Sequence, residues 1–177
     1  AVARAADLCG RVERPDLLLL GALLHDIGKG YPGDHTVVGM TLVHDIAQRM
    51  GFNDDDTQTL VLLVEHHLLL PDIATRRDLD DPATIRWVAA CSGTIERLHL
   101  LSALTEADSI ATGRSAWGAW KAGLVSTLVD RAEHVLDGGE ATDVTTSSER
   151  LAVNSELMAR YSAGSAPLII TEGNELT

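Results

Sequence analysis

The chain has 177 residues, a formal net charge of −12 and an aromatic content of only 3%. This length suffices for one full-size domain with a substantial core, and the low aromatic content argues against a sandwich or a barrel. The negative charge and the scattered arginines argue against nucleic-acid binding. The longest apolar run, near positions 17–24, is too short to cross a bilayer. We therefore expect a cytoplasmic protein with neither a nucleic-acid nor a membrane partner.

Apolar residues recur at helical spacing from the first residues, and this pattern resumes after Pro15. The stretch 16–28, DLLLLGALLHDIG, has no polar face, so we expect a helix that is buried on every side and carries His25 and Asp26 near its end. A loop rich in glycine follows. The next segment, 36–50, has its apolar residues on one stripe and predicts an amphipathic helix.

Start and stop signals divide the rest of the chain into further helices. Asn53 and the three aspartates after it indicate a helix start, and we expect Pro71 to end that helix. A polar connection, 71–81, is predicted next, and Pro82 is placed to begin another helix. Two longer helices are expected, over 94–112 and 115–136.

The C-terminal part differs in composition from the rest. Residues 137–148 have the composition of a linker, and a short helical segment follows at 149–161. The run LIIT, 168–171, is the only convincing β-pattern, and one strand cannot bury itself. We therefore expect an all-α bundle over 1–136 and the start of a further domain within 149–177.

The pair His25 and Asp26 is the first candidate for chemistry. A carboxylate among apolar side chains costs several kcal/mol unless it is paired or bound to a metal. A neutral imidazole beside a carboxylate oxygen suits Mn, Fe, Zn or Mg. A buried hydrogen-bonded pair without a metal explains the same two residues. A second pair, His44 and Asp45, lies on an amphipathic helix that gives it access to water, and we expect no metal there.

A second apolar helix ends in the adjacent pair His66 and His67. Leu60, Leu63 and Val64 share a helix face with His67, whereas His66 is turned by roughly 100°. A histidine on an apolar face is more often a core residue than a ligand. Two apolar helices that both end in histidine favour a shared site, with His67 preferred to His66.

The helix 94–112 carries one acid on its apolar face. Asp108 follows the stripe of Leu98, Leu101 and Leu104, whereas Glu106 is expected to point away. A carboxylate on the core side needs a partner. His25, Asp26, His67 and Asp108 would together form a mixed site for a divalent metal.

Further polar residues lie near these candidates in the sequence. His35 begins a helix, where the positive end of the dipole favours a neutral ring that could bind a second metal or a phosphate, although an exposed residue is an equal alternative. Lys29, three residues after Asp26, could neutralise a phosphate. Arg76 and Arg77 could contact a substrate, or could simply be solvated.

Three phrases of the sequence carry a family resemblance: GALLHDIGKGYPGDHTVVG, EHHLLLPDIATRRDLDDPATI and LTEADSIATG. With the His-Asp pair, the later histidines and the late aspartate, the chain resembles the HD superfamily of metal-dependent phosphohydrolases. The phrases are most similar to the HD domain of bifunctional PII uridylyltransferase/uridylyl-removing enzymes. The match covers roughly positions 1–135.

The resemblance implies a site and a reaction. His25, Asp26, Asp108 and either His35 or His67 correspond to the metal ligands of the pattern, and a further histidine is expected a few residues before Ala1. The implied reaction removes UMP, or AMP in some relatives, from a tyrosine of the PII signal protein. Glutamine would act as effector through other domains, and LIIT would begin an ACT-like domain.

Two other functions remain open at this stage. The domain could be a phosphohydrolase that acts on a free nucleotide, or a regulatory module without catalytic activity inside a glutamine sensor. Among the candidate residues, Asp26, Lys29 and His35 are assigned to catalysis. Metal binding is assigned to His25, Asp26, His35, His66, His67 and Asp108, and substrate binding to Lys29, Arg76 and Arg77.

Overall fold

The computed structural model describes residues 2–113, 115–139 and 141, and across these ranges the chain is all-α, as expected. The helices are α1 (Val2–Cys9), α2 (Pro15–Leu24), α3 (His35–Met50), α4 (Asp54–Glu65), α5 (Leu69–Arg76), α6 (Pro82–Ser92), α7 (Ile95–Thr112) and α8 (Ala119–Leu136). None of them is both long and apolar enough to span a bilayer. The predicted segments 149–161 and 168–171 lie outside the described residues.

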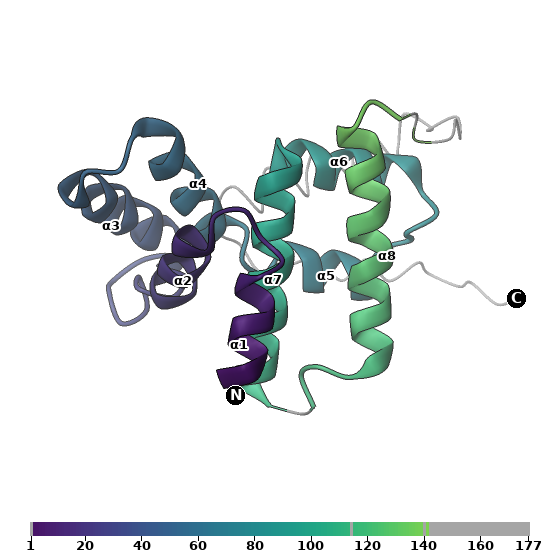
Figure 1. Cartoon of the computed structure of the whole chain (residues 1–177), viewed down its shortest axis with the longest axis horizontal. Coiled ribbons are helices and arrows are strands. Elements are labelled where there is room, and N and C mark those ends of the chain that lie inside the picture. The colour runs from purple at the N-terminus through teal and green to yellow at the C-terminus, as the bar shows by residue number, and fades with distance from the viewer. Residues whose placement is uncertain (1, 114, 140, 142–177) are drawn as a thin grey trace, which may run out of the picture.

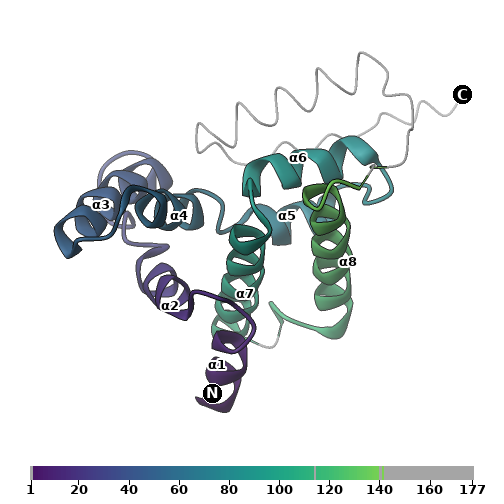
Figure 2. The same ribbon diagram turned by 45° about the horizontal axis from the view of Figure 1, so that its top comes forward.

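Helix α7 runs through the middle of the domain. In both ribbon views, α2, α3 and α4 lie on one side of it and α5, α6 and α8 on the other (Figures 1 and 2). Its leucines at 98, 100, 101 and 104 are at most 1% exposed. Each such side chain contributes roughly 2 kcal/mol on burial, so α7 is the element on which both halves of the bundle pack.

Several predicted helix ends are confirmed, and capping residues explain them. The Asn53 side chain accepts a hydrogen bond from the backbone of Asp56 and begins α4, and Thr94 caps α7 in the same way. Asp81 caps α6, with Pro82 at its first position. Gly51 ends α3 with a φ of 84°, a backbone conformation in which glycine is favoured.

Three predicted helix ends are wrong. Helix α2 ends at Leu24, so His25 and Asp26, which were expected inside the helix near its end, follow it instead. Pro71 does not end a helix but lies in the first turn of α5, where a residue needs no intrahelical N–H bond. The predicted connection 71–81 is therefore helical up to Arg76. Helix α8 begins at Ala119 rather than at 115, because Gly118 has an extended backbone and is the N-cap.

The expectation that α2 is buried on every side is also wrong. Leu17, Leu18 and Leu24 are buried, but Leu19 is 59% exposed and Leu23 is 76% exposed. These two residues are four positions apart and share a face. The helix packs against α4 and α7 and has an uncovered side within the described part of the chain.

Candidate metal centre

Four chain segments bring imidazoles and carboxylates together beside α7. His25 and Asp26 follow directly after α2, and His67 follows α4 by two residues. His35 is the first residue of α3. Asp108 lies in the C-terminal part of α7. Each side chain is therefore carried by an element end or by a helix that the core holds in place.

Distances define the centre of this cluster. Asp26, His35 and His67 each offer one ligand atom within 4.8 Å of the others. Asp26 Oδ1 lies 3.9 Å from His67 Nε2, and Asp26 Oδ2 lies 3.2 Å from His25 Nε2. The Nε2 atom of His25 is also 3.6 Å from Asp108 Oδ1. The rings of His25 and His35 have centroids 5.4 Å and 6.2 Å from that of His67.

Two of the histidines are oriented in the same way. His25 Nδ1 is 3.0 Å from the carbonyl oxygen of Ala22, and His67 Nδ1 is 2.7 Å from that of Val64. A carbonyl oxygen only accepts, so Nδ1 donates in both cases and the neutral ring keeps its lone pair on Nε2. Both Nε2 atoms face Asp26. This is how metal-binding histidines are held by backbone carbonyls.

Asp26 is ionised within this cluster. Burial raises its pKa, but the hydrogen bond from Lys29 and the nearby His25 and His67 outweigh that effect, so the net pKa lies below its usual value. Lys29 Nζ is 2.5 Å from Asp26 Oδ2. The other oxygen, Oδ1, is buried and has no hydrogen-bond partner among the described residues. A buried carboxylate oxygen without a donor is strongly favoured to take a cation.

His67 is neutral at physiological pH. It is 6% exposed, and burial lowers its pKa more than the neighbouring Asp26 raises it. A neutral imidazole is the form that binds a metal. The ionised carboxylate and the neutral ring are therefore the protonation states that a divalent cation requires.

A glycine allows the turn after α2 to approach α3. A Cβ atom on Gly28 would lie 1.9 Å from the carbonyl oxygen of His35 and 2.7 Å from the backbone nitrogen of Gly39. Both distances are far below van der Waals contact. Only glycine therefore lets Asp26 come close to His35 in this arrangement.

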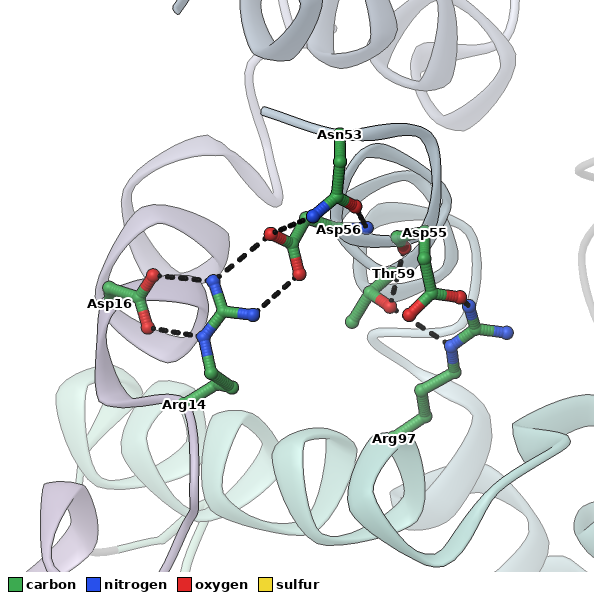
Figure 3. A network of polar contacts seen from close by, with 7 residues as sticks. All are labelled: Arg14, Asp16, Asn53, Asp55, Asp56, Thr59 and Arg97. Carbon is green, nitrogen blue, oxygen red and sulfur yellow. Dashed lines mark hydrogen bonds and ion pairs between the residues drawn. The ribbon is translucent and has the colours of Figure 1, made fainter. Parts of the chain in front are cut away.

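Arginines join the opposite ends of the same helices (Figure 3). Arg14, just before α2, binds Asp56 at the start of α4 at 2.6 and 3.1 Å. Arg97, in the first turn of α7, binds Asp55 at 2.6 Å and Thr59 at 2.9 Å. Helices α2, α4 and α7 are thus tied at their N-terminal ends and carry candidate ligands at or near their C-terminal ends.

The residues in the cluster fit a divalent metal. Two nitrogen donors with backbone-held rings, one carboxylate with an unpartnered buried oxygen and a second carboxylate 3.6 Å from His25 form a mixed N/O set. Such sets suit Mn, Fe, Zn or Mg rather than a thiolate-preferring metal. His35 lies where it could complete the shell or bind a second ion.

The other sequence candidates lie apart from this group. His66 is buried, and burial lowers its pKa, but it is not one of the three residues, Asp26, His35 and His67, whose ligand atoms lie within 4.8 Å of one another. Arg77 is the C-cap residue that follows α5, and Arg76 lines a hollow away from the cluster. His44 and Asp45 are 57% and 71% exposed at the side chain, in agreement with the expected accessibility of this second pair.

Sequence reasoning missed three groups that position the site. Gly28 could have been recognised from the HDIGKG phrase only if the close approach of α3 were known. Glu106 was expected to point away from the core, but it is 9% exposed and accepts a hydrogen bond from Arg11 at 3.1 Å. The contacts of Arg14 with Asp56 and of Arg97 with Asp55 join residues 42 positions apart, which no local pattern reveals (Figure 3).

Comparison with known proteins assigns the family. The family model described as "HD domain" matches residues 1–113. The chain is 57% identical over 155 residues to the bifunctional uridylyltransferase/uridylyl-removing enzyme of Streptomyces coelicolor, which covers 85% of the chain and 19% of that protein. The protein of the same name from Mycobacterium tuberculosis is 56% identical over 135 residues, covering 76% of the chain and 17% of that protein.

A more distant relative has the same name. The bifunctional uridylyltransferase/uridylyl-removing enzyme of Rhodospirillum rubrum is 39% identical over 149 residues, with coverage of 82% of the chain and 16% of that protein. The chain thus spans less than a fifth of the length of these relatives. No solved structure matches it. From the family match and the His/Asp cluster, the chain belongs to the HD domain family.

Proposed function

We propose that the chain is the nucleotide-removing part of a bifunctional nucleotidyltransferase and hydrolyses the phosphodiester between a nucleotide and a tyrosine of the PII signal protein. The observation that carries the proposal is the orientation of His25 and His67, whose Nε2 atoms face the ionised Asp26. The names of the relatives, which include a uridylyl-removing activity, support the reaction class.

The residues divide into ligands and substrate contacts. His25, Asp26, His67 and Asp108 would hold the metal, and His35 would bind a second ion or a phosphate oxygen. A divalent metal in this position supplies Lewis acidity that makes water nucleophilic near neutral pH. Lys29, with its side chain 63% exposed, would turn from Asp26 to the phosphoryl oxygens and stabilise their negative charge.

The domain boundaries and the cellular context follow the same proposal. The hydrolytic unit would span 1–136, because α8 packs on α5, α6 and α7 and completes the bundle beyond the matched range. Residues 137–148 would link it to an ACT-like domain that begins within 149–177 and transmits the glutamine signal. The protein would act in the cytoplasm, where PII is its substrate.

The test uses the protein at the full length of its relatives. We expect Asp26→Ala to retain nucleotide transfer to PII but to lower nucleotide release by at least about 1000-fold, since several kcal/mol of metal-derived stabilisation are lost. Asp45→Ala, in the exposed His-Asp pair, is the matched control and should leave release unchanged. Unchanged release from modified PII in Asp26→Ala would refute the proposal, and turnover of free nucleotides alone would indicate a different substrate.

A further inference from the structure

A hollow lies outside the metal cluster. It has a volume of about 400 Å³ and is formed by α5 together with the segment that leads into α8. This volume lies within the range of small-molecule sites. Its lining includes Asp72, Arg76, Ser115, Gly118, Trp120 and Lys121. None of them belongs to the group of Asp26, His35 and His67.

Two cations line this hollow in a chain with a net charge of −12. Lys121 is one of only two lysines, and its Nζ donates to the carbonyl oxygen of Ala116 at 3.2 Å. A guanidinium nitrogen of Arg76 lies 3.8 Å from Asp72 Oδ1, and this distance is longer than a charge-assisted hydrogen bond. The two positive charges of Lys121 and Arg76 outnumber the single carboxylate, that of Asp72, in the lining. The guanidinium of Arg76 also has five N–H donors, so the hollow favours an anion.

An exposed aromatic side chain lies beside these cations. Trp120 is 71% exposed, whereas Trp87 in α6 is 6% exposed. An indole in water forgoes the free energy of burying its large apolar surface. It offers a flat face on which a nucleobase can stack, and such stacking is worth roughly 1–3 kcal/mol per base.

We propose that this hollow binds a nucleoside monophosphate, with the base against Trp120 and the phosphate between Arg76 and Lys121. The ligand needs both an aromatic ring and a dianion, and a mononucleotide is a small molecule that has both. Ser115, whose side chain carries a hydroxyl, also lines the hollow, and Gly118 leaves the start of α8 without a side-chain cap. The hollow is a site separate from the proposed hydrolytic centre, and its occupancy does not depend on that reaction.

Calorimetric titration of the 177-residue chain with UMP and AMP, in EDTA, tests the site. We expect saturable binding of at least one nucleotide, with uridine or adenosine and inorganic phosphate each at least about tenfold weaker, because each retains only half of the contacts. Arg76→Gln and Lys121→Gln should each weaken binding at least about fivefold, and Trp120→Ala at least about tenfold. Arg131→Gln, at an exposed ion pair elsewhere on α8, is the matched control.

Asp26→Asn distinguishes this hollow from the metal centre. Nucleotide affinity should be unchanged in this variant, since Asp26 does not line the hollow. Loss of nucleotide binding in Asp26→Asn together with full binding in the Trp120 and Arg76 variants would place the nucleotide at the metal centre and overturn the proposal. An absence of binding by the wild-type chain at millimolar nucleotide would overturn it as well.

Discussion

At the scale of single residues, the protonation of His67 links the site to stability. Burial lowers the pKa of this histidine from 6.5 in the folded chain, so the unfolded chain takes up a proton first as the pH falls. In EDTA, the melting temperature should therefore decrease between pH 7.5 and pH 5. The decrease should level off once the folded-state pKa is passed.

Replacement of the titrating ring isolates this contribution. His67→Gln should show a shallower dependence of melting temperature on pH than the wild type, followed by circular dichroism at each pH. Some slope should remain, because burial lowers the pKa of His66 in the same direction. Identical slopes in the two proteins would contradict a neutral, buried His67.

Gly28 gives a second prediction at this scale. Gly28→Ala should lower the free energy of unfolding by at least about 2 kcal/mol, because the new methyl group would collide with the backbone of α3. It should also weaken Mn²⁺ binding by moving Asp26 away from His35. Gly123→Ala, where nothing lies within 4 Å, is the control and should be neutral or stabilising by about 0.5 kcal/mol. Equal stability of the two variants would refute the close-approach argument.

At the scale of elements, the arginine contacts explain how α4 is held. Arg14→Ala would leave Asp56, 9% exposed, without its main cationic partner. A double-mutant cycle between Arg14→Ala and Asp56→Ala, measured by urea unfolding, should give a coupling of about 1–2 kcal/mol. The exposed pair of Arg131 and Asp80 should give less than about 1 kcal/mol. A coupling near zero at Arg14 would contradict this account.

Capping residues made several helix starts predictable from the sequence. Which side chains are buried could be predicted only in part. Asn53, Asp81 and Thr94 act locally, so their effect can be seen in the sequence. The exposure of Leu19 and Leu23 depends on which neighbours cover α2, which no pattern within the helix encodes.

The candidate site was likewise predictable only in part. His67 is buried, as its place on an apolar stripe predicted. Helix α7, however, is buried on several faces because both halves of the bundle pack on it, so Glu106 is buried and the Asp108 side chain is 35% exposed. The metal-binding roles of His67 and Asp108 stay predictions. The place of Arg76 was not predictable, since it depends on where α8 packs against α5.

At the scale of the whole molecule, the bundle has two candidate functional sites. The metal cluster lies among α2, α3, α4 and α7, and the cationic hollow lies between α5 and the start of α8. Helix α7 contacts both α4, which leads to His67 in the metal cluster, and α5, which lines the hollow. We propose that His25, Asp26, His67 and Asp108 hold one divalent ion.

Anomalous diffraction from crystals of the chain grown with Mn²⁺ would locate this ion. We expect one strong manganese peak roughly 2.0–2.4 Å from His25 Nε2, His67 Nε2 and an oxygen of Asp26, with Asp108 as a further ligand. The peak should disappear in Asp26→Asn crystals. A manganese ion bound elsewhere, such as at the acids that begin α4, with no peak between His25 and His67, would contradict the account.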